Sequence, residues 1–141
     1  MKIRCSRMKE PIADSETSYH PLYLEGIEHF NHCDFFESHE SWEDLWTDYR
    51  GPSRKFYQGL IQAAAAFYHV LNNNPKGVIR LAEEAQNKLR GFAPVYKHTI
   101  DISELLAALK GFAAQSREIL GSTLTGFDFD RLPKIKVLVR E

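Results

Sequence analysis

The residues best suited to chemistry lie in two predicted helical segments, on either side of residue 51. His39 and Glu43 are four residues apart, which places them on one surface of a helix with Trp46 one turn beyond. A histidine and a carboxylate in this arrangement can transfer a proton or bind a divalent metal ion. We therefore predict that His39 and Glu43 form the catalytic pair of a small helical protein.

The second segment carries a polar stripe on an otherwise apolar helix, formed by Gln58, Gln62 and His69. An unpaired buried polar group costs roughly 1–3 kcal/mol, so these side chains need partners. The nearest candidates across the helix pair are His39 and Glu43, which predicts a shallow polar pocket open to a small-molecule ligand whose identity the sequence does not give. The predicted pocket residues are Trp46, Gln58 and Gln62, and the predicted ligands of a divalent metal cofactor are His39, Glu43 and His69.

Two alternatives to a metal centre stay open at this point. Without a metal, Glu43 would orient His39 as a general base near neutral pH. In a non-catalytic interaction module, the same polar residues would form a buried hydrogen-bond network that fixes the helix register. A cleft that reaches solvent at His39 favours a catalytic or metal site, whereas a large exposed apolar patch favours the interaction module.

Known sequence motifs add little to these hypotheses. The run His39-Glu40-Ser41-Trp42-Glu43 is similar to the HExxH helix of zinc proteases, with glutamate in place of the second histidine. The sequence contains no P-loop, no GxSxG and no zinc-finger spacing.

Apolar residues recur at helical spacing along most of the chain and predict five helices, at about residues 21–32, 34–49, 53–72, 75–91 and 101–120. Asp34 with Glu37, and Asp101 with Glu104, have the spacing of capping boxes. The break at Gly51-Pro52 makes the second and third helices antiparallel neighbours. The third helix is apolar almost all round, which places it in the middle of a bundle. The inward face predicted for the second helix consists of Phe35, His39, Trp42, Trp46 and Tyr49.

These elements predict an all-α fold, a single-domain bundle of about five helices with an extended C-terminal tail. The predicted organisation is a loosely ordered N-terminal arm at 1–19, the helical bundle at 20–122, and a tail at 123–141 that packs on the bundle. Ile135, Val137 and Val139 alternate as in a strand. A single strand has no partner within the predicted bundle, so we expect the tail to lie on the helices or on a second chain.

Composition narrows the class of partner. The 141 residues include 18 basic and 19 acidic side chains, for a net charge of -1, which argues against binding to nucleic acid or to an anionic membrane. No apolar run reaches about 18 residues, and the first twenty residues lack the apolar core of a secretory signal. Cys5 and Cys33 do not make a disulfide framework. We expect a cytoplasmic protein, and a homodimer, because the apolar third helix and the tail need more cover than one chain supplies.

Three stretches of the sequence resemble domain-of-unknown-function family 309, a family of small all-helical proteins of bacteria and archaea without an established activity. They are FNHCDFFESHESWEDLW at 30–46, RKFYQGLIQAAAAFYH at 54–69 and NNNPKGVIRLAEEA at 72–85, within a resemblance that covers about residues 20–92. Cys33 stands where the family usually has a small residue, most often glycine. The resemblance implies that the HxxxE face matters and supplies no reaction. The family positions that it marks are His39, Glu43, Trp46, Gln58, Gly59, Gln62 and His69.

Overall fold

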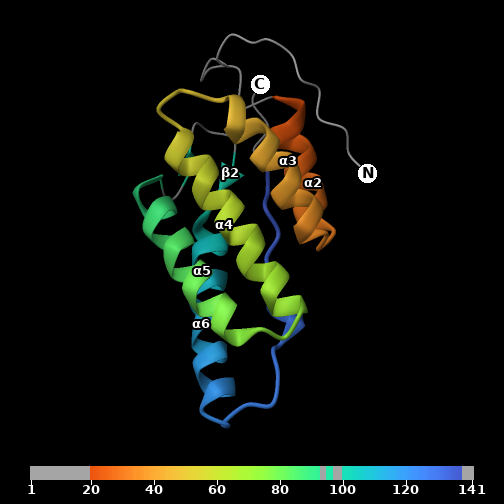
Figure 1. The fold of residues 1–141 in the computed structure, drawn as a ribbon, viewed down its shortest axis with the longest axis vertical. Coiled ribbons are helices and arrows are strands. Elements are labelled where there is room, and N and C mark those ends of the chain that lie inside the picture. Colours follow the sequence, from red (N-terminus) through yellow and green to blue (C-terminus); the bar gives the residue numbers. More distant parts are fainter. Residues whose placement is uncertain (1–19, 93–94, 97–99, 138–141) are drawn as a thin grey trace.

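The computed structural model describes residues 20–92, 95–96 and 100–137. Each helix in these residues packs against the next one along the chain, and the all-α prediction is confirmed (Figure 1). The predicted arm at 1–19 and Val139 lie outside the described residues. The α-helices are α2 (Pro21–Asn31), α3 (Phe35–Asp48), α4 (Arg54–Leu71), α5 (Pro75–Leu89) and α6 (Ser103–Leu120), with short 3-10 helices η1 (Arg90–Phe92) and η2 (Phe129–Arg131).

Helix α4 lies in the middle of the bundle, between α3 and α5 (Figure 1). Ten of its 18 residues are buried, as its nearly unbroken apolar sequence predicts. Phe67 shows how the layers connect, because its ring packs edge-on against Phe30 of α2 and Phe112 of α6. A single continuous core therefore joins the first and last helices through α4.

The buried face of α3 is rotated relative to the prediction. Trp42 and Tyr49 are buried as expected, but Ser38 and Leu45 take the inward positions assigned to His39 and Trp46, which lie half-buried at the edge. The reason is that α2 satisfies the serine hydroxyls of α3. Ser38 Oγ donates a hydrogen bond to Gly26 O at 2.8 Å, and Ser41 Oγ donates to Glu25 Oε2 at 2.6 Å.

The predicted starts of α3 and α5 are confirmed in position, whereas the predicted capping hydrogen bonds form only in part. Asn74 caps α5, where its side-chain oxygen accepts a hydrogen bond from Gly77 N. Asp34 occupies the N-cap of α3 without a side-chain hydrogen bond to the helix, so this capping box is not formed. Helix α6 begins at Ser103 and not at 101 as predicted, and Asp101 accepts a hydrogen bond from Ser103 N at 2.8 Å in place of the second capping box.

Three residues that follow helices adopt left-handed backbone conformations. Cys33 after α2, Asn73 after α4 and Ser122 after α6 have φ angles of 62°, 54° and 68°. This conformation carries a steric cost for residues with a Cβ and none for glycine. A glycine at position 33, as the resemblance drawn from the sequence implies, would avoid this cost.

A small antiparallel pair of strands, β1 (Val95–Tyr96) and β2 (Ile100–Asp101), connects η1 to α6 and was not predicted. Ile100 also forms an isolated bridge with Val137, so the strand-like tail does have a partner within the chain, contrary to the prediction. In Figure 1 the tail, in blue, runs back along the helices from the far end of α6 toward β2. Ile135 of the tail is buried against the bundle. None of the described helices is both long enough and apolar enough to cross a membrane.

Candidate functional site

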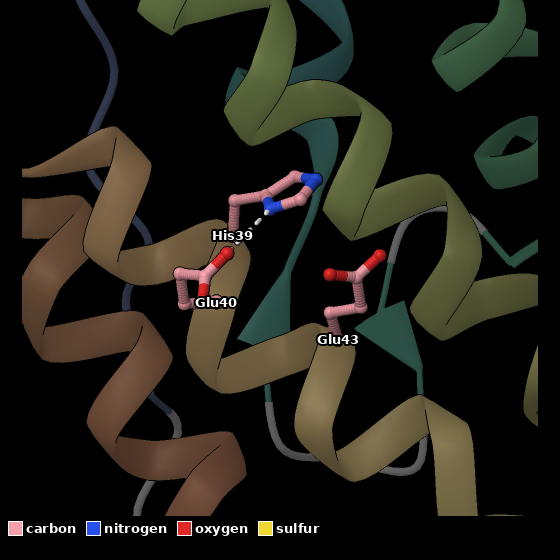
Figure 2. Close-up of side chains that lie close together, drawn as sticks. All are labelled: His39, Glu40 and Glu43. Atoms are coloured by element: carbon pink, nitrogen blue, oxygen red, sulfur yellow. Dashed lines mark ion pairs between the residues drawn. The ribbon is translucent and has the colours of Figure 1, made fainter. Parts of the chain in front are cut away.

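Three side chains of α3 that can bind a metal lie together: His39, Glu40 and Glu43 (Figure 2). One potential ligand atom from each lies within 4.8 Å of the others, and all three residues are half-buried. His39 Nδ1 is 3.9 Å from Glu40 Oε2. In the part of the chain that the structure describes, no second group of three such residues is found. The cluster follows from helix geometry, since positions three and four apart are neighbours on a helix surface.

Glu40 is the member of this cluster that the sequence prediction missed. Its spacing of three from Glu43 and its place directly after His39 were visible in the sequence. In the HExxH helix of zinc proteases, the glutamate directly after the first histidine acts as a general base and does not bind the metal. The similarity to that motif therefore did not indicate Glu40 as a ligand.

The ring of His39 has one sheltered nitrogen. Nδ1 is buried and has no hydrogen-bond partner, although 28% of the side-chain surface is exposed. A buried nitrogen without a partner costs free energy comparable to a lost hydrogen bond. His39 therefore offers, beside two carboxylates, a buried nitrogen without a hydrogen bond, whose contact with Glu40 is an ion-pair distance of 3.9 Å.

A pocket of about 200 Å³ adjoins the cluster between α3 and α4. The rings of Phe36 and Tyr68 are in contact at its rim, with centroids 5.9 Å apart. The pocket is largely apolar, in contrast to the polar pocket predicted from the sequence, because α4 presents Ala65 and Tyr68 to His39 rather than glutamine side chains. Its lining residues are Phe35, Phe36, His39, Ala65 and Tyr68.

Gln62 and His69 face α5 and not the cluster. Gln62 Nε2 donates a hydrogen bond to Glu84 Oε1 at 3.0 Å, so its partner is not His39 or Glu43 as expected. Nδ2 of Asn74 lies 3.2 Å from Nδ1 of His69 and donates to it. Two residues seven apart lie on nearly the same side of a helix, so the rotation that carries Gln62 toward α5 carries His69 with it. The structure thus does not bring the predicted third ligand to His39.

Burial lowers the pKa of His69, and the nearby positive charge of Arg80 lowers it further. Both effects favour the neutral imidazole, which can accept the hydrogen bond from the Asn74 amide.

Trp46 and Gln58 are half-buried, and neither lines the pocket beside His39. The guanidinium of Arg54 lies over the Trp46 ring, 3.9 Å from its centroid. Arg54 also donates hydrogen bonds to Trp46 O at 2.9 Å and Tyr49 O at 2.6 Å, near the end of α3. Arg54 therefore adds hydrogen bonds to two carbonyl groups at the end of the helix, as basic residues commonly do there.

The protein is thus a small all-α bundle in which one helix carries a histidine and two glutamates beside an apolar pocket. Residues 23–81 match the model of the family described as a domain of unknown function (DUF309), which confirms the resemblance drawn from the sequence. The matched segment runs from α2 into α5 and contains the cluster and every residue that lines the pocket. No curated protein and no solved structure was found to match the chain.

Proposed function

We propose that this chain binds a divalent transition-metal ion through His39, Glu40 and Glu43. The observation that carries the proposal is the buried His39 Nδ1, which has no hydrogen bond and lies next to two carboxylates, with one potential ligand atom from each residue within 4.8 Å of the others. Bonds of 2.0–2.2 Å to a common ion put its ligands roughly 3–3.5 Å apart, so modest side-chain rotations would complete the site. Two carboxylates would neutralise the charge of the ion.

The composition of this site supports chemistry at the metal rather than a purely structural role. Structural zinc sites in proteins almost always use four protein ligands, whereas catalytic sites use three and leave a position for water or substrate. An ion held by His39, Glu40 and Glu43 would activate a bound water or polarise a carbonyl oxygen. The reaction class that fits is hydrolysis of a small molecule, in the cytoplasmic setting expected from the sequence.

The test is elemental analysis of the untagged protein purified without chelator, followed by titration of the metal-free protein with Co²⁺ monitored by visible absorption. We expect one ion per chain in the parent. Removing a direct ligand with His39→Ala should weaken binding by more than roughly tenfold, since loss of outer-shell partners alone costs this much. Glu40→Gln and Glu43→Gln should also weaken binding.

Glu37→Gln is the matched control, because Glu37 is exposed on the same helix and lies outside the cluster. Circular dichroism of each variant separates loss of the ion from loss of the fold. A folded parent that binds no Co²⁺, or a His39→Ala variant with unchanged affinity, would overturn the proposal.

A second candidate function is the non-catalytic interaction module, with a second copy of the chain as partner. The observation that favours it is the exposed aromatic pair on α3 and α4, where Phe36 is 53% and Tyr68 40% exposed. Light scattering of the purified protein tests this candidate. A dimer that dissociates in Phe36→Ser but persists in Leu120→Ser, which alters an exposed leucine at the end of α6, would support it.

A further inference from the structure

The metal cluster and the apolar pocket meet at a single residue. His39 belongs to the cluster with Glu40 and Glu43, and its ring is also part of the pocket wall. Any molecule that fills the pocket therefore lies against the same imidazole that faces the two carboxylates. The place for an apolar group and the place for a metal-bound group therefore share His39.

The size and lining of the pocket select the kind of group that it can hold. Its volume of about 200 Å³ exceeds that of an engineered apolar cavity of roughly 150 Å³ that holds benzene. The rings of Phe36 and Tyr68 are inclined to each other by 46° and both border the pocket. A six-membered ring or a branched aliphatic group of similar size fits this volume.

We infer that the substrate is a small molecule with one compact apolar or aromatic group, joined by a short link to an oxygen-bearing group that binds the metal. This inference rests on the proposed metal site. The link must be short because His39 borders both subsites. We assign an oxygen donor to the metal-binding group, such as the carbonyl of an ester, amide or hydroxamate, because the proposed hydrolysis requires the ion to polarise a carbonyl oxygen.

Ala65 is the residue that sets the size of the apolar group. It is the smallest side chain in the pocket wall and is contributed by α4, opposite His39. It is half-buried, so a longer side chain there can extend into the pocket without being forced into the core. Ala65→Leu should therefore fill the pocket while leaving the cluster on α3 intact.

The experiment compares two hydroxamates that share a metal-binding head and differ in their apolar group. Benzohydroxamic acid carries a phenyl ring, and acetohydroxamic acid carries only a methyl group. Both are titrated into the Co²⁺-loaded parent, into Ala65→Leu, and into Ala114→Leu, which makes the same change at an exposed site on α6. The visible spectrum of the bound cobalt reports the metal and the ligand separately.

We expect the parent to bind benzohydroxamic acid at least roughly tenfold more tightly than acetohydroxamic acid, from burial of the ring. Ala65→Leu should abolish this preference and leave Co²⁺ binding and acetohydroxamic acid affinity unchanged, while Ala114→Leu should behave as the parent. A parent that binds cobalt but does not distinguish the hydroxamates overturns the inferred substrate class alone, as does a preference that survives in Ala65→Leu. A parent without cobalt binding overturns the metal site and, with it, the assigned head group.

Discussion

The side-chain amide of Asn31 is paired in both directions with the backbone of Ile135. Asn31 Nδ2 donates a hydrogen bond to Ile135 O at 2.8 Å, and Ile135 N donates to Asn31 Oδ1 at 2.7 Å. The two residues are 104 positions apart in the sequence. The amide therefore makes the two backbone hydrogen bonds that a neighbouring strand would otherwise make. These bonds hold the tail against the bundle, where the Ile135 side chain is buried.

Asn31→Ala should therefore loosen the tail and lower the free energy of unfolding. Two hydrogen bonds at about 0.5–1.5 kcal/mol each give an expected loss of about 1–3 kcal/mol. Asn31→Asp keeps the acceptor and loses the donor, so its tail should still be held in part through Ile135 N. Urea denaturation gives the stability, and amide hydrogen exchange at Ile135 reports the tail directly. Unchanged exchange at Ile135 in Asn31→Ala would contradict this role.

His69 should make stability depend on pH in a defined window. Burial and Arg80 hold its pKa below the ordinary value of 6.5, so the unfolded chain binds a proton that the folded chain resists. Stability from this group is complete above pH 6.5 and is lost as the pH falls below that value. Denaturation of the parent and of His69→Gln across this range should give a stability difference that is constant above pH 6.5 and changes below it. If the stabilities of the parent and His69→Gln differed by the same amount at all pH values, His69 would not be the cause of the pH dependence.

Gly26→Ala should be strongly destabilising, because the added methyl group would overlap the indole ring of Trp42. Trp42 is fully buried and its Nε1 donates a hydrogen bond to Tyr23 O at 3.1 Å, so the ring has no room to move. Overpacking of this kind costs about 1–3 kcal/mol or more. Gly111→Ala is the matched control, since a methyl group there meets open space on α6 and should stabilise the protein by about 0.5–1 kcal/mol. Thermal unfolding should show a lower melting temperature than the parent for Gly26→Ala and a higher one for Gly111→Ala.

Ser122→Gly should stabilise the protein. Ser122 has a φ of 68° and is exposed, so glycine would relieve the steric cost of the left-handed conformation and give up little packing. That cost is roughly 1–2 kcal/mol, partly offset by the greater flexibility of glycine in the unfolded chain. We expect a net gain of up to about 1 kcal/mol by denaturant unfolding. Ser122→Ala keeps the Cβ and should show no such gain.

The features predicted correctly from the sequence are the local ones. Helical spacing identified the five α-helices of the described residues and the central place of α4, because the apolar pattern and the breaks at Gly51-Pro52 and Asn74-Pro75 act within a few residues. The common surface of His39 and Glu43 follows from their spacing alone. The β1–β2 pair was missed because strands of two residues are too short to show an alternating pattern.

The rotation of α4 about its own axis could not be predicted in the same way. Periodicity shows that Gln62 and His69 share a stripe, but α4 is nearly apolar all round and has neighbours on several sides. The pattern therefore does not say which neighbour the stripe faces. The choice depends on Glu84 of α5, which supplies a partner for Gln62, and on Ala65, which lies beside His39. The pocket and the absence of His69 from the cluster both follow from that choice.

The segment that matches the family is shorter than the part of the chain that folds together. Two contacts reach beyond it: Phe67 packs against Phe112, and the Asn31 amide binds the tail. The family match ends at residue 81, inside α5, yet the core that surrounds the matched segment continues into α6 and Ile135. Cutting the chain at the edge of the match would expose one side of Phe67 and leave the amide of Asn31 without the backbone it binds. Residues outside the recognised family segment therefore complete the cooperative structure that holds the His39 cluster in place.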